Sequence, residues 1–403
     1  MNIVYVGDCG PKPSGAPISC DQLLRALAAV GCRVRALAPS LAAGDPDLVA
    51  FDDARPEIEA HHYPVPAYFF HPFERPSADW DRATRTGIDE GLERLVAGSR
   101  PDVLLIRELW LPYAIDAARR HGIPTVAMIR GNPTTAILAG VFPADLTMSF
   151  LHALRQVDRI VAVARHLLPG LRDLGFNGVT CIPNAVDVTR FAPAPRDERL
   201  AARLGIQDDD IVVLHASQLR PIKRPLDIVR SAPAVLRRNP RLLYVIVGEG
   251  MSRDEMRSLA ERSGVGARFR FEPFVDNSLM PRYVNLADLV VMPSEREGLS
   301  RVFLEAHACG RTLVASDIAA AREVVVHGET GLLFRKGDVD DLAEKTLQAA
   351  ADPALRFAIG RRARQHVEQH HDIRTAASAY RSLLAQLIAD CCYCEGVQRG
   401  RPA

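Results

Sequence analysis

Short apolar runs and longer amphipathic stretches alternate along most of this chain. The apolar runs predict buried strands, and apolar positions spaced three or four residues apart predict helices between them. The predicted strands are residues 1–7, 33–38, 103–106, 125–129, 159–164, 178–182, 211–215, 242–247, 268–271 and 289–292. The predicted helices are residues 22–30, 88–97, 113–121, 150–157, 167–173, 226–237, 338–350, 354–370 and 373–390, with a short one from Arg301. Such alternation is typical of parallel sheets covered by helices on both faces, so we expect an α/β fold.

With 403 residues, the chain is long enough for two domains of ordinary size. Residues 184–199 contain Pro193 and Pro195, which favours a linker there. The expected boundaries are a first domain over residues 1–187, a second over 188–370, a last helix over 371–390 and a tail over 391–403.

Composition and charge narrow the class of protein. An apolar content of 48% and a charged content of 25% are those of a soluble globular protein. A net charge of +1 does not indicate a nucleic-acid partner. No apolar run approaches the roughly 20 residues that span a bilayer. Met1 leads into a strand rather than a signal peptide, and the eight cysteines lack zinc-ligand spacing, so we expect a cytoplasmic protein with free thiols.

Residues 293–334 carry the most specific chemistry in the sequence. Glu297 and Glu305 bracket the start of a short predicted helix. That helix begins at Arg301 after Ser300, a residue type that favours the N-cap. One acid therefore precedes the helix and the other lies about one turn inside it.

The amino end of this short helix is expected to bind a diphosphate. The preceding strand, 289–292, ends just before the loop, and open α/β sheets bind ligands at the carboxyl ends of their strands. The unpaired amides of residues 300–302 and the helix dipole favour a phosphate. Glu297 and Glu305 would accept hydrogen bonds from hydroxyls on either side. In the alternative interpretation Glu305 only complements the helix dipole and Glu297 is a solvated loop charge.

These residues lie within P-S-x-x-E-G-x-x-x-x-x-L-E-A-x-A-x-G, which resembles the signature of the family-4 retaining glycosyltransferases. The resemblance continues through residues 182–187, 248–250 and 330–334 and covers nearly the whole chain. It implies the GT-B fold, in which two doubly wound Rossmann-like domains face a central cleft. The acceptor would bind the first domain and a nucleotide-sugar donor the second, and the last helix would cross back to the first domain. It also implies sugar transfer with retention of configuration and without a metal.

The resemblance places a phosphate-binding loop at residues 217–225. The family pattern there is roughly G-R-L-x-x-x-K-G, whose arginine and lysine pair with the donor diphosphate. Lys223 falls on the lysine, but Gln218 falls on the arginine and supplies no charge. Arg220 or Arg224 is expected to compensate. Lys223 is one of only four lysines in the chain, so we expect a phosphate ligand rather than a solvated loop charge.

Further donor contacts follow from the resemblance alone. Phe274 and Val275 occupy the place where the family binds the nucleobase. Glu305 would hold the ribose diol and Glu297 the transferred sugar. The other expected donor contacts are Gly15, Gly298, Leu299, Ser300, Arg301 and Val302.

Arg130, which follows the strand 125–129, would face the donor or acceptor, and it completes an expected catalytic set with Glu297 and Lys223. The alternative is a salt-bridged arginine at a strand end. The sequence departs from the family pattern at Ser14-Gly15 and at Ala319-Ala320, where a glycine pair is common.

No metal site is expected. With 49 acidic residues, D-x-D matches arise by chance, as at residues 45–47, 208–210 and 338–340. His61, His62 and His71 are interpreted as surface or packing residues, and His307 as a buried packing residue. The nucleotide sugar is a co-substrate, so no cofactor is expected.

The expected activity is transfer of a hexose or N-acetylhexosamine from a UDP-sugar to a hydroxyl of a soluble small-molecule or saccharide acceptor. A membrane-lipid acceptor is disfavoured, because the first domain lacks a basic amphipathic helix. Two alternatives use the same phosphate cradle. One is a sugar-nucleotide hydrolase or epimerase; the other is a non-catalytic sugar-nucleotide-binding module, which Gln218 and Ala319-Ala320 favour. The sequence indicates no oligomeric state.

Overall fold

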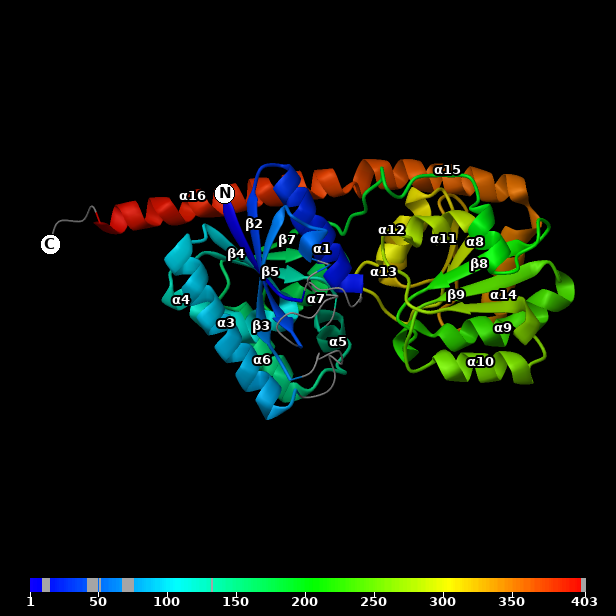
Figure 1. The fold of residues 1–403 in the computed structure, drawn as a ribbon, viewed down its shortest axis with the longest axis horizontal. Helices are drawn as coiled ribbons and strands as arrows, with labels where there is room; N and C mark the ends of the chain where they lie inside the picture. Colours follow the sequence, from blue (N-terminus) through cyan, green and yellow to red (C-terminus); the bar gives the residue numbers. More distant parts are fainter. Residues whose placement is uncertain (9–14, 42–49, 51, 67–75, 132, 400–403) are drawn as a thin grey trace. The chain divides into compact units, whose positions relative to one another are not determined.

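The structure, a computed structural model, describes residues 1–403 except 9–14, 42–49, 51, 67–75, 132 and 400–403, and only the backbone of residues 15, 16 and 392–399. The chain forms two compact units (Figure 1). Unit 1 consists of Met1–Pro183 and Ile373–Ala403, and unit 2 of Asn184–Asp372. The chain therefore leaves unit 1 after Pro183 and returns to it with its last helix.

Unit 1 is built on a seven-stranded parallel sheet with the strand order β3-β2-β1-β4-β5-β6-β7. The strands are β1 (Asn2–Val6), β2 (Arg33–Ser40), β3 (Ile58–Pro64), β4 (Val103–Arg107), β5 (Thr125–Ile129), β6 (Arg159–Ala162) and β7 (Val179–Cys181). The helices are α1 (Gly15–Ala29), α3 (Ala78–Gly98), α4 (Leu111–Arg120), α5 (Thr134–Leu138), α6 (Ala144–Leu154), α7 (Leu167–Asp173), α16 (Ile373–Arg399) and the 3-10 turn η1 (Glu108–Trp110). Helix α1 packs against α16, whereas α3, α4 and α6 pack in succession.

Unit 2 has a six-stranded parallel sheet with the order β10-β9-β8-β11-β12-β13. Its strands are β8 (Ile211–Ala216), β9 (Leu242–Val247), β10 (Phe269–Glu272), β11 (Leu289–Met292), β12 (Thr312–Ser316) and β13 (Leu332–Phe334). Its helices are α8 (Glu198–Arg203), α9 (Pro225–Arg238), α10 (Arg253–Arg262), α11 (Met280–Leu286), α12 (Arg301–Ala308), α13 (Ala319–Arg322), α14 (Val339–Ala351), α15 (Pro353–His370) and the 3-10 turns η2 (Pro221–Lys223) and η3 (Gly266–Arg268). Helices α9, α10 and α14 pack together on one face, and α11, α12 and α15 on the other (Figure 1).

The predicted fold class, two doubly wound parallel-sheet units, is confirmed. Strands β5, β9 and β11 have the predicted bounds. Strand β3 was not predicted, because its sequence IEAHHYP buries only Ile58 and Tyr63 and so contains no apolar run. At the edge of a sheet, pairing with β2 is enough to hold it.

Helix α16 extends beyond the expected end at Asp390 and runs to Arg399. The predicted tail over 391–403 is therefore wrong for the described residues 391–399. A single glycine, Gly396, costs a helix only about 1 kcal/mol, so it does not stop one that is already formed. Among the described residues, no helix is long and apolar enough to cross a lipid bilayer.

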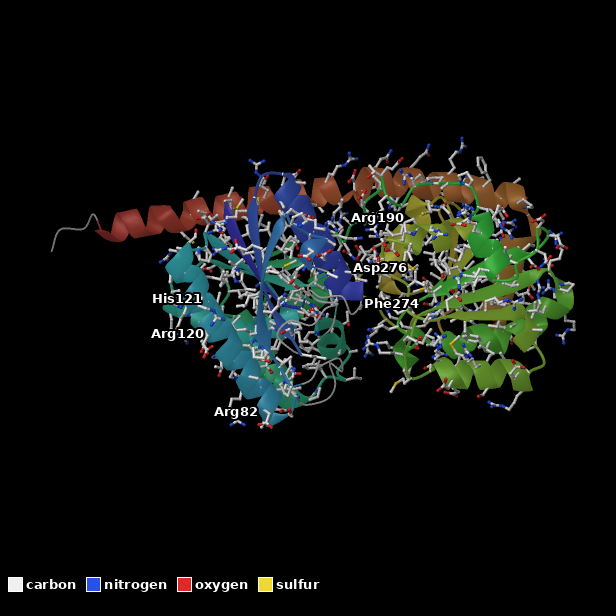
Figure 2. All side chains as sticks on the ribbon, in the orientation of Figure 1. Arg82, Arg120, His121, Arg190, Phe274 and Asp276 are labelled. Atoms are coloured by element: carbon white, nitrogen blue, oxygen red, sulfur yellow. The ribbon has the colours of Figure 1, made fainter. Side chains whose placement is uncertain are left out.

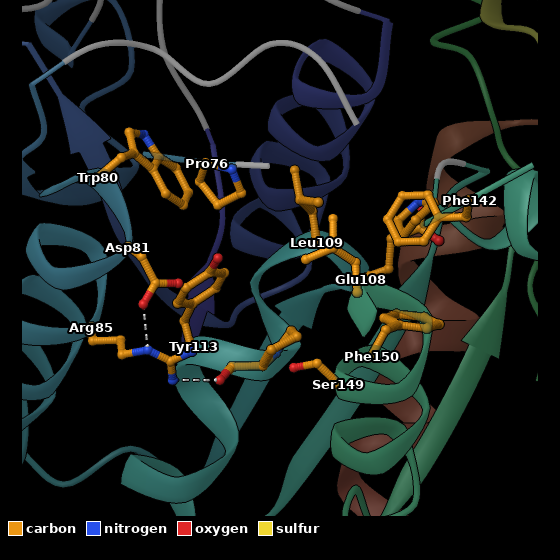
Figure 3. Close-up of a pocket in the computed structure, with 13 residues that line it drawn as sticks. Pro76, Trp80, Asp81, Arg85, Glu108, Leu109, Tyr113, Phe142, Ser149 and Phe150 are labelled. Carbon is orange, nitrogen blue, oxygen red and sulfur yellow. Dashed lines mark hydrogen bonds and ion pairs between the residues drawn. The ribbon is translucent and has the colours of Figure 1, made fainter. Parts of the chain in front are cut away.

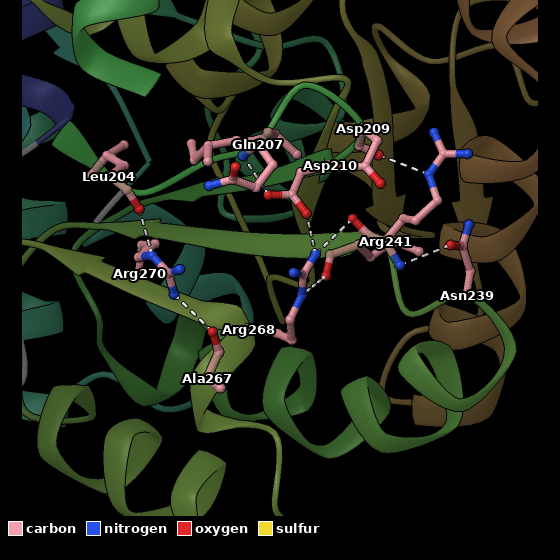
Figure 4. Close-up of polar contacts among 12 residues, drawn as sticks. Leu204, Gln207, Asp209, Asp210, Asn239, Arg241, Ala267, Arg268 and Arg270 are labelled. Carbon is pink, nitrogen blue, oxygen red and sulfur yellow. Dashed lines mark hydrogen bonds and ion pairs between the residues drawn. The ribbon is translucent and has the colours of Figure 1, made fainter. Parts of the chain in front are cut away.

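The amino ends of the unit 2 strands are fixed by arginines (Figure 4). Arg268 pairs with Asp210 at 2.5 Å and donates from Nε to the Leu242 carbonyl at 2.8 Å. Arg270 donates to the Leu204 carbonyl at 2.6 Å. This network explains Asp210 of the D-x-D match at 208–210 as a structural residue, and it lies at the strand ends opposite to those that bind ligands in such sheets.

Each sheet has one point where the chain reverses its direction of winding. In unit 1 that point lies between β1 and β4, and in unit 2 between β8 and β11. Crevices at the carboxyl ends of such strand pairs are where open α/β sheets bind ligands. The loops after β8 and β11 contain Lys223 and Glu297, so the fold itself brings the two predicted residues to one edge.

Candidate functional site

Lys223 and Glu297 form a close ion pair at the carboxyl edge of the unit 2 sheet. Lys223 Nζ lies 2.6 Å from Glu297 Oε1 and 2.7 Å from Oε2. The side chains are only 18% and 8% exposed, respectively. The structure thus brings together two predicted site residues that are far apart in sequence, and each neutralises the charge of the other.

Neighbouring hydrogen bonds hold Glu297 in place. Ser294 Oγ donates to Glu297 Oε1 at 2.7 Å, and Ser316 Oγ donates to the Ser294 carbonyl at 2.5 Å. The Glu295 amide donates to the Ile222 carbonyl at 2.8 Å, which joins the two loops through their backbones. The lysine and the carboxylate are therefore positioned by rigid loops.

The loop after β8 supplies a second cation to this edge. Arg220 is largely buried, which lowers the pKa of its guanidinium, and the negative charge of Glu297 opposes that shift. Arg224 instead pairs with Asp227 at 2.6 Å and with Glu295 at 3.3 Å, and its backbone is left-handed, with φ of 48°. Of the two arginines expected to compensate for Gln218, Arg220 is the one within electrostatic reach of Glu297.

His215 joins β8 to β11 beneath the Lys223–Glu297 pair. Its Nδ1 donates to the Val291 carbonyl at 2.8 Å, and Nε2 lies 2.8 Å from Ser217 Oγ. Burial lowers the pKa of the imidazole to about 4. The ring is therefore neutral near pH 7 and acts as a structural link.

Helix α12 begins and ends where the sequence predicted, at Arg301 and before Gly310, whose φ is 66°. Ser300 occupies the N-cap position, but its side chain makes no capping hydrogen bond. The predicted N-cap position of Ser300 is thus confirmed. The amides of the first turn have no partner within the helix. Asn184 Nδ2 donates to the Leu299 carbonyl at 3.0 Å and fixes the chain just before that turn.

Glu305 is completely buried within the first turns of α12. Arg301 Nη1 lies 3.3 Å from Oε1, an ion-pair contact without hydrogen-bond geometry, and neither carboxylate oxygen accepts a hydrogen bond from the described residues. Burial raises the pKa of this carboxyl, and the charges of Arg301 and Arg190 oppose the shift. An oxygen pair that is buried and lacks donors is suited to a ligand that carries two hydroxyls.

Arg190 was not predicted as a site residue, yet it lies within the electrostatic reach of Glu305, Arg301 and Asp276. Phe274, two residues before Asp276, is 40% exposed, whereas Val275 is buried (Figure 2). The sequence signal for Arg190 was its position three residues after the segment 182–187, which carries the family resemblance.

Arg130 in unit 1 is held by its neighbours on several sides. Its amide donates to Glu108 Oε1 at 2.9 Å, and its guanidinium donates to Ser19 Oγ. The buried Tyr380 of α16 also lies within electrostatic reach of the Arg130 guanidinium. The last helix therefore contributes to the surroundings of a predicted catalytic residue.

Glu108 was missed by the sequence reasoning, although a charged residue directly after the buried strand β4 was a signal for it. The side chain is fully buried and accepts a hydrogen bond from Thr134 Oγ1 at 2.7 Å. Burial raises the pKa of its carboxyl to about 7. Gly15 is the first residue of α1, whereas Ser14 lies outside the described residues.

The described residues contain no group of three or more histidine, cysteine, aspartate and glutamate side chains that could hold a metal. His61 and His62 pair with Glu59 and Asp52. Asp338 caps α14 by accepting from the Asp341 amide at 2.9 Å. Residues 45–47 and His71 lie outside the described part of the chain.

Two further predicted positions have structural roles. Ala319 and Ala320 begin the short helix α13 instead of forming the glycine pair common in the family pattern. His307 is completely buried in α12, as expected for a packing residue, and burial lowers the pKa of its imidazole to about 3.

Comparison with known proteins assigns the family. Residues 196–366 match the family described as Glycosyl transferases group 1, and residues 13–190 match Glycosyltransferase Family 4. A D-inositol 3-phosphate glycosyltransferase of Nocardiopsis dassonvillei is 30% identical over 328 residues, which span 73% of this chain and 75% of the relative. The chain belongs to the family-4 glycosyltransferases.

A second relative matches a smaller region of the chain, and a solved structure has the same fold. A GDP-mannose-dependent monoacylated alpha-(1-6)-phosphatidylinositol monomannoside mannosyltransferase of Corynebacterium glutamicum is 34% identical over 196 residues, or 46% of this chain and 51% of the relative. The crystal structure of Anabaena Alr3699/HepE in complex with UDP and glucose has a TM-score of 0.78 and 21% identity, covering 96% of this chain and 100% of that chain. This glycosyltransferase therefore has the GT-B fold.

Proposed function

We propose that this glycosyltransferase moves a hexose or N-acetylhexosamine from a UDP-sugar to a hydroxyl of a small-molecule or saccharide acceptor, with retention of the anomeric configuration. The observation that carries the proposal is the Lys223–Glu297 pair at the winding reversal between β8 and β11, next to the amino end of α12. A cation, a carboxylate and unpaired amides at one sheet edge suit a sugar diphosphate.

The donor diphosphate would bind at the amino end of α12. Lys223, Arg220 and the amides of Ser300, Arg301 and Val302 would stabilise the negative charge that builds on the leaving diphosphate. Because Lys223 is held by Glu297 before the donor binds, a phosphate oxygen would share the ammonium with that carboxylate. Gly298 and Leu299, which directly precede Ser300, would contact the diphosphate through their backbone.

The two glutamates would bind the donor on either side of the diphosphate. Glu305 has buried oxygens that accept no hydrogen bond from the described residues, so it would accept from the ribose diol. Glu297 would bind the transferred sugar and stabilise positive charge at its anomeric carbon. Phe274 and Val275 would contact the base, while Arg130 and Gly15 would act in unit 1.

We favour UDP because the Anabaena structure of the same fold contains it. The Corynebacterium relative is described as dependent on GDP-mannose, so GDP is the competing base. A thermal-shift panel of UDP-, GDP-, ADP- and dTDP-sugars tests the base, since a ligand that binds the folded state raises its melting temperature. We expect the largest shift with a UDP-sugar. A larger shift with another nucleotide would overturn the choice of base.

Transfer is tested with the best-binding donor and a panel of hydroxyl acceptors. We expect a glycoside whose anomeric configuration, measured by proton NMR, equals that of the donor. Incubation with donor alone separates the alternatives: rapid release of free sugar or an epimerised donor indicates a hydrolase or epimerase. Binding without any turnover indicates a non-catalytic module, and an inverted product overturns retention.

A further inference from the structure

Unit 1 contains a cavity of about 120 Å³ that the donor site does not use (Figure 3). It lies between the start of α3, the start of α4 and the region around α6. Its lining residues are Pro76, Trp80, Asp81, Arg85, Glu108, Leu109, Pro112, Tyr113, Pro133, Phe142, Leu146, Ser149 and Phe150. All of them belong to one unit, so the cavity is a property of that unit alone.

The cavity opens at the ligand-binding edge of the unit 1 sheet. Glu108 follows β4, one of the two strands at the winding reversal, and Pro133 follows β5. Glu108 accepts the amide of Arg130 at 2.9 Å, so one wall of the cavity is hydrogen-bonded to a proposed catalytic residue. A group bound here would extend toward the edge of the sheet where the acceptor is expected.

Aromatic side chains make much of the lining. Trp80 and Tyr113 meet edge to face, with ring centroids 5.6 Å apart and planes at 80°. The Arg85 guanidinium lies 4.9 Å from the centre of the Tyr113 ring. Figure 3 shows Phe142 and Phe150 on the opposite side. Aromatic walls of this kind favour another ring, in offset or edge-to-face contact.

The charged side chains of the Tyr113 wall are paired with protein groups. Arg85 Nε lies 3.0 Å from Asp81 Oδ2, and its Nη1 donates to the Pro112 carbonyl at 3.1 Å. Neither charge needs a ligand of opposite sign. A polyol or phosphate in this cavity would leave hydroxyls or charge facing rings, which is costly without hydrogen-bond partners.

The volume of the cavity limits the size of the ligand that can bind in it. An apolar cavity of about 150 Å³ accepts benzene, so a cavity of about 120 Å³ accepts one six-membered ring that protrudes slightly from the mouth. Ser149 lines that mouth and is exposed, whereas Phe150 and Trp80 lie deep and are buried. A polar substituent would therefore stay near the mouth.

We propose that this cavity binds the aromatic ring of a hydroxyl-bearing acceptor. The inference rests on the proposed transferase function and narrows its acceptor class from small molecules and saccharides to alcohols or glycosides that carry one aryl group. Such an acceptor differs from the phosphorylated polyol named for the Nocardiopsis relative.

Binding is tested in the whole protein by tryptophan fluorescence, because Trp80, one of two tryptophans in the chain, lines the cavity. The probe is 2-phenylethanol, with 2-cyclohexylethanol, 1-octanol and myo-inositol as comparisons. We expect saturable quenching by 2-phenylethanol, weaker quenching by the two other alcohols and none by myo-inositol. Tighter binding of 1-octanol would identify an acyl-chain site and overturn the aryl assignment, as would the absence of saturable quenching.

A matched pair of variants locates the binding. Ser149→Phe places a ring in the cavity mouth, whereas Met148→Phe places the same ring at the neighbouring α6 position, which does not line the cavity and is 64% exposed. Both should melt at the wild-type temperature. We expect Ser149→Phe to weaken 2-phenylethanol binding at least tenfold and Met148→Phe to change it less than twofold. Equal effects would overturn the site.

Transfer kinetics test the acceptor role. With an active donor, Ser149→Phe should raise KM for 2-phenylethanol at least tenfold while leaving thermal stabilisation by the nucleotide unchanged. Transfer to other hydroxyls with no quenching by any aryl alcohol would overturn this inference and leave the proposed function intact. Quenching by 2-phenylethanol with no transfer from any donor would overturn the proposed function and, with it, the acceptor role.

Discussion

At the scale of single residues, Lys223 and Glu297 depend on each other. Glu297 is 8% exposed and its two oxygens share one ammonium. Removing one partner of such a pair leaves a poorly solvated charge, which costs more than the pair contributes. The same arrangement holds the Lys223 ammonium in one position, where the proposed function places a donor phosphate.

Replacing either residue should therefore abolish most of the activity. We expect Lys223→Ala and Glu297→Ala each to lower turnover at least a hundredfold, equivalent to about 2.7 kcal/mol in the activation barrier. Steady-state kinetics with the best donor measure the loss, and circular dichroism confirms folding. Lys345→Ala, the same change on α14, should leave the rate unchanged. Wild-type rates in both site variants would refute the site.

Glu305 allows a test of ribose recognition without measuring activity. Because burial disfavours the charge of this carboxylate more strongly than Arg301 and Arg190 favour it, the neutral side chain of Glu305→Gln should not lower the melting temperature of the free protein. It should weaken UDP at least tenfold and change the affinity for 2′,3′-dideoxy-UDP less than twofold. Calorimetric titration measures both. An equal loss for the two nucleotides would contradict the role.

The sequence could predict where Glu297 and Glu305 lie, because the motif fixes their spacing around the start of α12. It could not decide between Arg220 and Arg224, since that depends on Asp227 and Glu295, which hold Arg224 in a left-handed turn. Glu108 had only a weak sequence signal, its place after strand β4, because its burial and its contact with the Arg130 amide depend on the folded structure.

At the scale of elements, the loop after β8 is held by the loop after β9. The Leu219 amide donates to the Glu249 carbonyl at 2.8 Å, and the Ser252 amide donates to the Leu219 carbonyl at 2.9 Å. Gly248 makes this approach feasible: its φ is 130°, and a Cβ there would lie 1.9 Å from the Ser217 carbonyl oxygen. The glycine thus allows the close backbone approach that fixes the loop proposed to bind phosphate.

Gly248→Ala should destabilise the protein strongly, by roughly 3 kcal/mol or more, because strain and a backbone clash combine. Urea unfolding measures the loss. Gly264→Ala is the control, since Gly264 also has a positive φ, of 70°, but open space around its Cβ. We expect a cost of about 1 kcal/mol there. Similar costs at both positions would show that the contact with Ser217 is unimportant.

Elements with strong apolar runs were predictable, and weaker ones were not. Strands β5, β9 and β11 are buried throughout, so their sequences are almost uninterrupted hydrophobic runs. The edge strand β3 and the end of α16 depend on pairing and on helix continuation, which local patterns do not reveal.

At the scale of the whole molecule, buried histidines are concentrated in unit 2. Burial lowers the pKa of His215 and His371 to about 4 and that of His307 to about 3. Unfolded histidine titrates near 6.5, so between pH 6.5 and the folded values the unfolded chain binds more protons. The contribution of these buried, neutral histidines to the free energy of unfolding is complete above pH 6.5. It is lost progressively as the pH falls from 6.5 toward their folded-state pKa values.

We therefore expect His307→Leu to reduce the acid destabilisation between pH 7 and pH 5. The histidine accounts for about 2 kcal/mol of that loss, from its depressed pKa. Urea unfolding at both pH values measures it. The exposed His152→Leu should leave the pH dependence as in the wild type. An unchanged pH dependence in His307→Leu would show that His307 is not the titrating group.

The return of α16 to unit 1 has a consequence for engineering. Unit 2 is one uninterrupted segment inserted into unit 1, between Pro183 and Ile373. Donor specificity can therefore be changed by replacing this one segment, Asn184–Asp372, with the corresponding segment of a related enzyme. A truncated chain that ends at Asp372 instead loses α16, and with it Tyr380, a buried residue of unit 1 that lies within electrostatic reach of Arg130.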